Sequence, residues 1–138
     1  MRLRPPASIL LAVFCGGALG TLARAALEEA FAPAPGHWPW TTFAVNLAGA
    51  FLLGAIIARF AGRTHSEQRV ALWGPGLCGG LTTFSTLQLE LFELLDGGHV
   101  ALALGYAAAS VAGGLALALL AMRLVERSGA AGAAESLR

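Results

Sequence analysis

GGLTTFST, residues 79–86, lies in the middle of the apolar run from Val70 to Leu89 and holds two glycines and four hydroxyl side chains in eight positions. In a bilayer every backbone polar group needs a partner within the protein. Such a segment is therefore expected where an interrupted helix binds something or lines a polar cavity. A break would free carbonyl oxygens that suit a hard cation, and hydroxyls and amides that suit a small anion. The alternative is a continuous packing helix whose hydroxyls bond back to the preceding turn.

The composition around this stretch is that of a membrane protein. Of the 138 residues, 57% are hydrophobic and 12% are charged, about half the charged share of a soluble domain. Four uncharged runs are each close to the roughly 20 residues that cross a bilayer: Ala7–Ala23, Thr41–Ala58, Val70–Leu89 and Val100–Met122. The sequence predicts an all-α membrane protein with four transmembrane helices, the third of them broken.

One domain is expected to hold all four helices. It covers residues 1–127, with Pro- and Gly-containing connections between the helices and an Ala- and Gly-rich tail, residues 128–138, that is expected to be disordered. The predicted helices span about residues 7–31, 41–60, 69–95 and 99–125.

No enzyme site is predicted. Cys15 and Cys78 fall in different apolar runs and match no metal-ligand spacing. The three histidines, His37, His65 and His99, are separated along the chain and form no cluster. No pattern typical of nucleic-acid binding is found either.

Arginines are distributed very unevenly about the predicted helices. With four crossings, both termini and the connection between the second and third helices share one face of the membrane. That face holds eight of the nine arginines: Arg2, Arg4, Arg59, Arg63, Arg69, Arg123, Arg127 and Arg138. The positive-inside rule then predicts that both termini are cytoplasmic, in a multi-pass protein of the cell membrane.

Small residues recur at helical spacing, as at Gly16 and Gly20 and at Ala50 and Gly54. Such spacings let helices approach closely. They serve either packing within one subunit or assembly of several, and both interpretations stay open. Because four short helices enclose little space, an oligomer is expected.

Neutral donors occupy single faces of the flanking helices. Thr42 and Asn46 are four residues apart, as are Tyr106 and Ser110, so each pair shares a helix face. An Asn amide offers two donors that need acceptors. No Asp or Glu lies in the centre of any run, which disfavours a proton-coupled carrier and favours an anion path.

The motifs resemble those of the small fluoride-channel family called CrcB or Fluc. The matching stretches cover all four helices in order, about residues 8–124. They are GALGTLAR (17–24), FAVNLAGAFLLG (43–54), GLCGGLTTFSTLQLE (76–90) and GYAAAS (105–110). The resemblance implies an antiparallel dimer with two fluoride pores. It also implies a structural sodium ion at the dimer interface, held by the backbone carbonyls of Gly79 and Thr82.

The same resemblance assigns the pore residues. Asn46 would donate to fluoride, Phe84 would turn a ring edge toward it, and Tyr106 and Ser110 match polar positions along the path. Ser85, Thr86 and Glu90 match a hydroxyl track that leads from it. Leu87 departs from the family, which has a second phenylalanine there. For Glu90 the alternative is a solvated residue at a helix end.

Arg24 matches the family's arginine in the first helix, either as a pore entrance or as part of a structural ion pair. Glu28 follows one turn later and is an available partner. A charged side chain within the hydrocarbon region costs about 2.5–3.5 kcal/mol of free energy unless it pairs with an opposite charge or extends to the membrane surface.

The implied function is passive export of cytoplasmic fluoride through the lipid bilayer. Eight arginines on one face should fix a single orientation, so we expect an antiparallel dimer with a homologous subunit of opposite orientation. Two alternatives remain: a small multidrug-type membrane transporter, and a membrane assembly subunit that transports nothing.

Overall fold

The computed structural model describes residues 5–60 and 67–135, which form helices and short connections without any strand. The chain is all-helical in this part, as predicted. The elements in chain order are α1 (Ala7–Ala30), α2 (Trp40–Phe60), α3 (Glu67–Ala71), the π-helix η1 (Leu72–Cys78), α4 (Gly79–Leu81), α5 (Phe84–Asp96) and α6 (Val100–Glu135).

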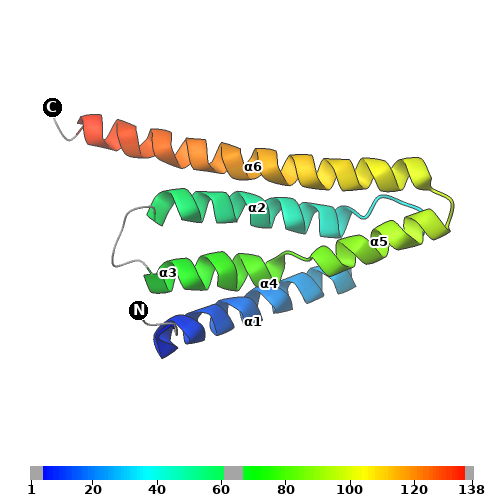
Figure 1. The fold of residues 1–138 in the computed structure, drawn as a ribbon, viewed down its shortest axis with the longest axis horizontal. Coiled ribbons are helices and arrows are strands. Elements are labelled where there is room, and N and C mark those ends of the chain that lie inside the picture. The colour runs from blue at the N-terminus through cyan, green and yellow to red at the C-terminus, as the bar shows by residue number, and fades with distance from the viewer. Residues whose placement is uncertain (1–4, 61–66, 136–138) are drawn as a thin grey trace.

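The elements form an elongated bundle (Figure 1). α6 packs along α2, and α1 packs against η1 and α4. α1 begins and α6 ends at the same end of the bundle, where α2 also ends and α3 begins (Figure 1). Four of the arginines used to predict orientation lie in these parts, namely Arg59, Arg69, Arg123 and Arg127. Arg2, Arg4, Arg63 and Arg138, like His65, lie outside the described residues.

Among residues 5–60 and 67–135, three helices are long and apolar enough to cross a membrane: α1, α2 and residues Val100–Gly129 of α6, with mean hydropathies of 1.8, 1.9 and 1.9. At most 22% of each span is buried within the chain. Large apolar side chains such as Phe14, Leu22 and Val111 are exposed along them. In water this much apolar surface would be unfavourable, so these faces suit lipid or another chain.

Close backbone packing joins α1 to η1 and α4. A Cβ atom on Gly16 would collide with the Leu72 carbonyl oxygen, and one on Gly20 would collide with the carbonyl oxygen of Leu77. Gly54 packs in the same way against the backbone of Ala118 in α6. Of the two interpretations of these small residues, packing within one subunit is therefore the one the contacts support.

The segment predicted as one helix over residues 69–95 is less regular than expected. Its first part widens into the π-helix η1, which contains Pro75 between Gly74 and Gly76. Proline has no amide hydrogen to give to an α-helical bond, and π-turns occur often near functional sites. This π-helix was not predicted from the sequence.

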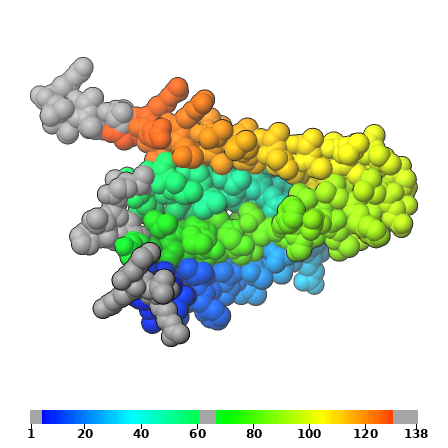
Figure 2. All heavy atoms as spheres, viewed as in Figure 1, coloured from blue at the N-terminus to red at the C-terminus, as the bar shows by residue number. Residues whose placement is uncertain are grey.

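α6 also differs from expectation, because its 36 residues continue to Glu135, beyond the end near 125 and through most of the segment predicted to be disordered. At 1.5 Å per residue such a helix is about 54 Å long. Its C-terminal part extends past the ends of the neighbouring helices (Figures 1 and 2).

A small hydrophobic core lies where α5 meets α6 and the start of α2. Its buried members are Leu87, Leu94, Ala103 and Tyr106. Trp38 covers them, with its ring 5.5 Å from that of Tyr106 in an edge-to-face arrangement, a favourable geometry for aromatic pairs. This core holds α5 against α6 and so fixes the polar residues on the adjoining turns.

Candidate functional site

Two residues between α4 and α5 leave the helical conformation. Thr82 has φ −76° and ψ 152°, and Thr83 has φ −142° and ψ 124°. We call them the extended pair. The Thr82 hydroxyl donates to the Cys78 carbonyl at 2.8 Å, whereas the Thr83 hydroxyl oxygen accepts from the Thr86 amide at 3.1 Å. Thr83 is thus the N-cap of α5, a position that threonine favours because its side chain replaces a missing backbone partner.

Asn46 holds the extended pair from α2. Its Nδ2 donates to the Thr83 carbonyl at 3.0 Å, and its Oδ1 accepts from the Thr83 amide at 2.8 Å. Both backbone groups of Thr83 are therefore satisfied by one side chain. Of the two amide hydrogens of Asn46, one is used here, and the described residues hold no hydrogen-bond partner for the other.

The carbonyls of Gly79 and Thr82 lose their usual helical partners as a result. In an α-helix they would accept from the amides four residues on, those of Thr83 and Thr86. The Thr83 amide instead binds Asn46 Oδ1, and the Thr86 amide binds Thr83 Oγ1. Gly79 is also exposed, and a Cβ there would meet no atom within 4 Å. Two carbonyl oxygens at this turn are thus left without their helical partners, and carbonyl oxygens are ligands of the kind that hard cations prefer.

Glu90 is buried and binds two hydroxyl donors. Thr42 Oγ1 donates to its Oε1 at 2.5 Å, and the Tyr106 hydroxyl donates to its Oε2 at 2.6 Å. These lengths are typical of hydrogen bonds to a carboxylate. Only 7% of Glu90 and none of Tyr106 is exposed. The interpretation of Glu90 as a solvated helix-end residue is therefore wrong.

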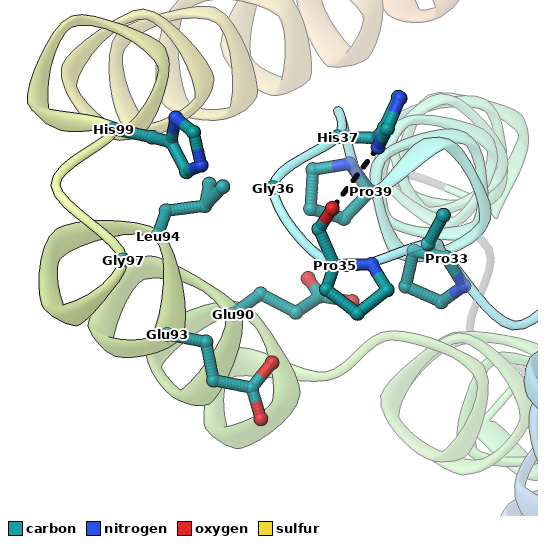
Figure 3. Close-up of a pocket in the computed structure, with 11 residues that line it drawn as sticks. Pro33, Pro35, Gly36, His37, Pro39, Glu90, Glu93, Leu94, Gly97 and His99 are labelled. Atoms are coloured by element: carbon teal, nitrogen blue, oxygen red, sulfur yellow. Dashed lines mark hydrogen bonds between the residues drawn. The ribbon is translucent and has the colours of Figure 1, made fainter.

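A hollow of about 420 Å³ opens beside Glu90. Glu90 and Glu93 of α5 line one side of it, and the connection of residues 33–39 with His37 lines the other (Figure 3). The Glu90 side chain reaches toward Pro35 in this view (Figure 3). The buried carboxylate thus adjoins an open space at the end of the bundle opposite to the start of α1 and the end of α6 (Figure 1).

Arg24 connects α1 to the segment before the extended pair. Its Nε donates to the Gly80 carbonyl at 3.3 Å, and its Nη1 binds Glu28 Oε1 and Oε2 at 3.3 and 3.1 Å. This confirms Glu28 as the available partner of Arg24. It is the one salt bridge in residues 5–60 and 67–135, so Glu90 does not pair with Arg24.

The other predicted residues are divided between surface and interior. Phe84, the first residue of α5, is 72% exposed, and Ser85 is also exposed. Leu87 is buried in the hydrophobic core, where it packs with Tyr106. The Ser110 hydroxyl oxygen is buried and has no hydrogen-bond partner among the described residues, which makes it available to a ligand.

Thr83 and Glu28 are central to the site, although neither was predicted to be a site residue. Thr83 could have been found, because a threonine directly before an apolar helical run is an N-cap signal. The contact of Glu28 with α5 joins residues 58 positions apart, and nothing in the local sequence predicts it.

The observed geometry defines a small helical membrane protein with a site of neutral hydroxyl and amide donors. Residues 11–122 match the family model described as CrcB-like protein, Camphor Resistance (CrcB). The chain belongs to this family.

Named relatives agree with the family match. Fluoride-specific ion channel FluC 1 of Mycolicibacterium paratuberculosis (strain ATCC BAA-968 / K-10) is 52% identical over 119 residues, 86% of this chain and 90% of that protein. Fluoride-specific ion channel FluC of Serratia proteamaculans (strain 568) is 44% identical over 119 residues, 86% of this chain and 94% of that protein.

Proposed function

We propose that this chain is a subunit of a passive fluoride-selective channel. The observation that carries the proposal is the similarity over most of the chain to proteins named fluoride-specific ion channels. The cluster of neutral donors around the extended pair supports it independently. Selectivity for a small anion requires donors that replace its hydration shell in a narrow path, and amides and hydroxyls do so without holding the ion as a fixed cation would.

The segment α3–η1–α4–α5 would cross the membrane as the third of four crossings, in addition to α1, α2 and α6. It runs opposite to α2 and α6 (Figure 1), and the extended pair interrupts it near the middle. Interrupted spans are tolerated where their backbone is buried in protein or lines a polar cavity. The arginine distribution would then place the termini in the cytoplasm.

The fluoride path follows the donors that remain available. These are the second amide hydrogen of Asn46 and the Ser110 hydroxyl. The hydroxyls of Ser85 and Thr86 lie next to the extended pair and contact Thr83 at 3.3 Å and Glu28 at 3.4 Å; each would join the path by turning away from that contact. Phe84 at the surface would contribute a ring edge. Tyr106 and Glu90 would lie at the end of the path, beside the hollow. A potential of 100 mV, negative inside, drives one anion outward by about 2.3 kcal/mol.

An antiparallel dimer is the proposed assembly. The exposure of Gly79 and Phe84 near the extended pair supports a partner at this surface. Sodium would bind there through the Gly79 and Thr82 carbonyls, because hard cations prefer oxygen ligands, and would hold the two interrupted segments together. The uneven arginines favour a homologous partner of opposite orientation.

The test is fluoride efflux from liposomes, measured with a fluoride electrode. The protein is purified from its own host without denaturation, so that a homologous partner is retained. We expect fluoride efflux well above that of empty liposomes, little chloride efflux, and strong loss in Asn46→Ala. Gln88→Ala is the control, because Gln88 is an exposed amide on α5. Efflux equal to that of empty liposomes would refute the proposal, and proton-coupled efflux of organic cations would favour the multidrug-type alternative.

Fluoride efflux by this chain, expressed without any second chain, tests whether a homologous partner is required. Robust conduction in the absence of any second chain would contradict a required heterodimer while leaving the fluoride channel intact.

A further inference from the structure

Glu28 lies at the end of a chain of hydroxyl hydrogen bonds. Its Oε1 accepts from Thr86 Oγ1 at 3.4 Å. Thr86 Oγ1 in turn accepts from Thr83 Oγ1 at 2.9 Å. This series of hydrogen bonds therefore runs from the extended pair through the first turn of α5 to a carboxylate on α1.

The Glu28 carboxylate sets the direction in which the hydroxyl groups of this series donate. A hydroxyl can turn its hydrogen either way, but an ionised carboxylate can only accept. With Glu28 at the end, the Thr86 hydrogen points toward α1 and the Thr83 hydrogen points toward Thr86. A hydroxyl directed at Glu28 is not available to another anion at the same time.

The contact is long enough to be exchangeable. Hydrogen bonds between oxygens are commonly about 2.7–2.8 Å, whereas Thr86 and Glu28 are 3.4 Å apart. Glu28 is held more closely by Arg24, at 3.1 Å. Loss of the Thr86 hydrogen would therefore leave Glu28 with its cationic partner, and the threonine could turn toward an ion in the path.

The position of Glu28 is otherwise unfavourable. It lies in the last turn of α1, next to Glu29, and that turn contains no basic residue. Carboxylates at a helix C-terminus oppose the macrodipole. Arg24 offsets this for Glu28, whereas Glu29 is exposed and forms no hydrogen bond or salt bridge with another described residue. Glu29 is thus a matched control, with the same charge and the same helix turn.

We propose that Glu28 is a specificity-determining residue of the fluoride path, a resident anion that competes with fluoride for the hydroxyl of Thr86. This inference rests on the proposed function. In the absence of fluoride the Thr86 hydroxyl is bound to Glu28, and an entering fluoride displaces that contact. The competition weakens fluoride binding at this point and so favours release, which a conducting path needs.

The test compares Glu28→Gln with Glu29→Gln in fluoride efflux measured over a range of fluoride concentrations. A hydrogen bond to a charged group exceeds a neutral one by about 1 kcal/mol. Removal of the charge should therefore lower the half-saturating fluoride concentration about fivefold, while Glu29→Gln stays within about twofold of the unmodified protein. A merely structural role would reduce maximal efflux and thermal stability and leave the half-saturating concentration unchanged, which would overturn the inference.

Thr86→Val separates competition from a change in local charge. In that background no hydroxyl remains to compete for, so Glu28→Gln should no longer alter the half-saturating concentration. A shift that persists would show that the unpaired Arg24 attracts the anion, and would overturn the inference.

If Glu28→Gln does not assemble, Glu28→Asp provides the second measurement. It keeps the charge but shortens the reach to Thr86, so it should also lower the half-saturating concentration, and an unchanged value would contradict the inference. Wild-type efflux in the same vesicles tests the proposed function independently of these comparisons.

Discussion

The hydroxyl of Tyr106, which is completely buried in α6, lies 2.6 Å from Oε2 of Glu90 in α5. This contact joins the hydrophobic core to the polar site, because the same tyrosine packs against Leu87 in the core. Glu90 has a second donor in Thr42 of α2. One carboxylate thus connects three helices.

Tyr106→Phe should destabilise the protein by about 1–3 kcal/mol, since it leaves a buried acceptor with one donor fewer. Thermal unfolding in detergent measures this. In a Glu90→Gln background the same substitution should cost less, because the two residues interact directly. Equal costs in both backgrounds would contradict the contact.

Gly16→Ala should destabilise the fold by about 1–3 kcal/mol, the usual range for an overpacked site, because its Cβ would collide with the Leu72 carbonyl oxygen. Gly17→Ala is the matched control, since its nearest neighbour would be the Gly76 carbonyl oxygen at 3.9 Å, an ordinary contact. Thermal unfolding and the monodisperse fraction on size exclusion distinguish the two. Similar behaviour would refute the packing of α1 on η1.

Gly79→Ala should behave differently from Gly16→Ala. The new Cβ meets no atom within 4 Å in the chain, and the backbone is already helical at φ −67°, so the fold of the subunit should be kept. If a partner covers this surface, dimer formation should fall instead. Single-molecule photobleaching in liposomes measures the dimer fraction, and an unchanged fraction would argue against an interface at Gly79.

Thr83→Ala removes the N-cap of α5 and should cost about 0.5–2 kcal/mol. Thr21→Ala on the exposed face of α1 should change the free energy of unfolding by less than about 0.5 kcal/mol. Denaturant-dependent unfolding of the detergent-solubilised protein measures both. Two equal values would mean that the cap contributes nothing to stability.

Exchange of sodium for a large organic cation should lower the melting temperature and the dimer fraction, if the Gly79 and Thr82 carbonyls hold sodium. The melting temperature rises with the concentration of any ligand that binds only the folded state. Potassium at the same ionic strength is the control for general salt effects. A melting temperature that is insensitive to sodium would exclude the proposed site.

Local features of this structure could be predicted from the sequence. The helices predicted over residues 7–31 and 41–60 agree with α1 and α2 to within one residue at each end, and the spacing of Arg24 and Glu28 predicted their contact. Helix periodicity also placed Thr42 and Asn46 on one face, and both contact the segment that follows α4. These relationships depend on neighbours within one or two turns.

Relationships between helices could not be predicted in this way. The contact between Thr42 and Glu90 joins residues 48 positions apart, and its formation depends on how α5 packs on α6. The burial of Leu87 depends on the same packing. The π-helix around Pro75 packs closely on the backbone of α1, a contact that the apolar character of the sequence does not specify.

Asn46 acts toward Thr83 as a substitute peptide unit, with a carbonyl and an amide in the positions that a neighbouring strand would supply. A carboxamide carries the donor and the acceptor on one carbon, as a peptide unit does, and the longer glutamine would push its amide away from α2. The extended pair between α4 and α5 therefore requires asparagine at position 46 in order to satisfy the Thr83 backbone groups. Any descendant of this sequence that keeps the extended pair would be expected to keep this asparagine, whichever ion it transports.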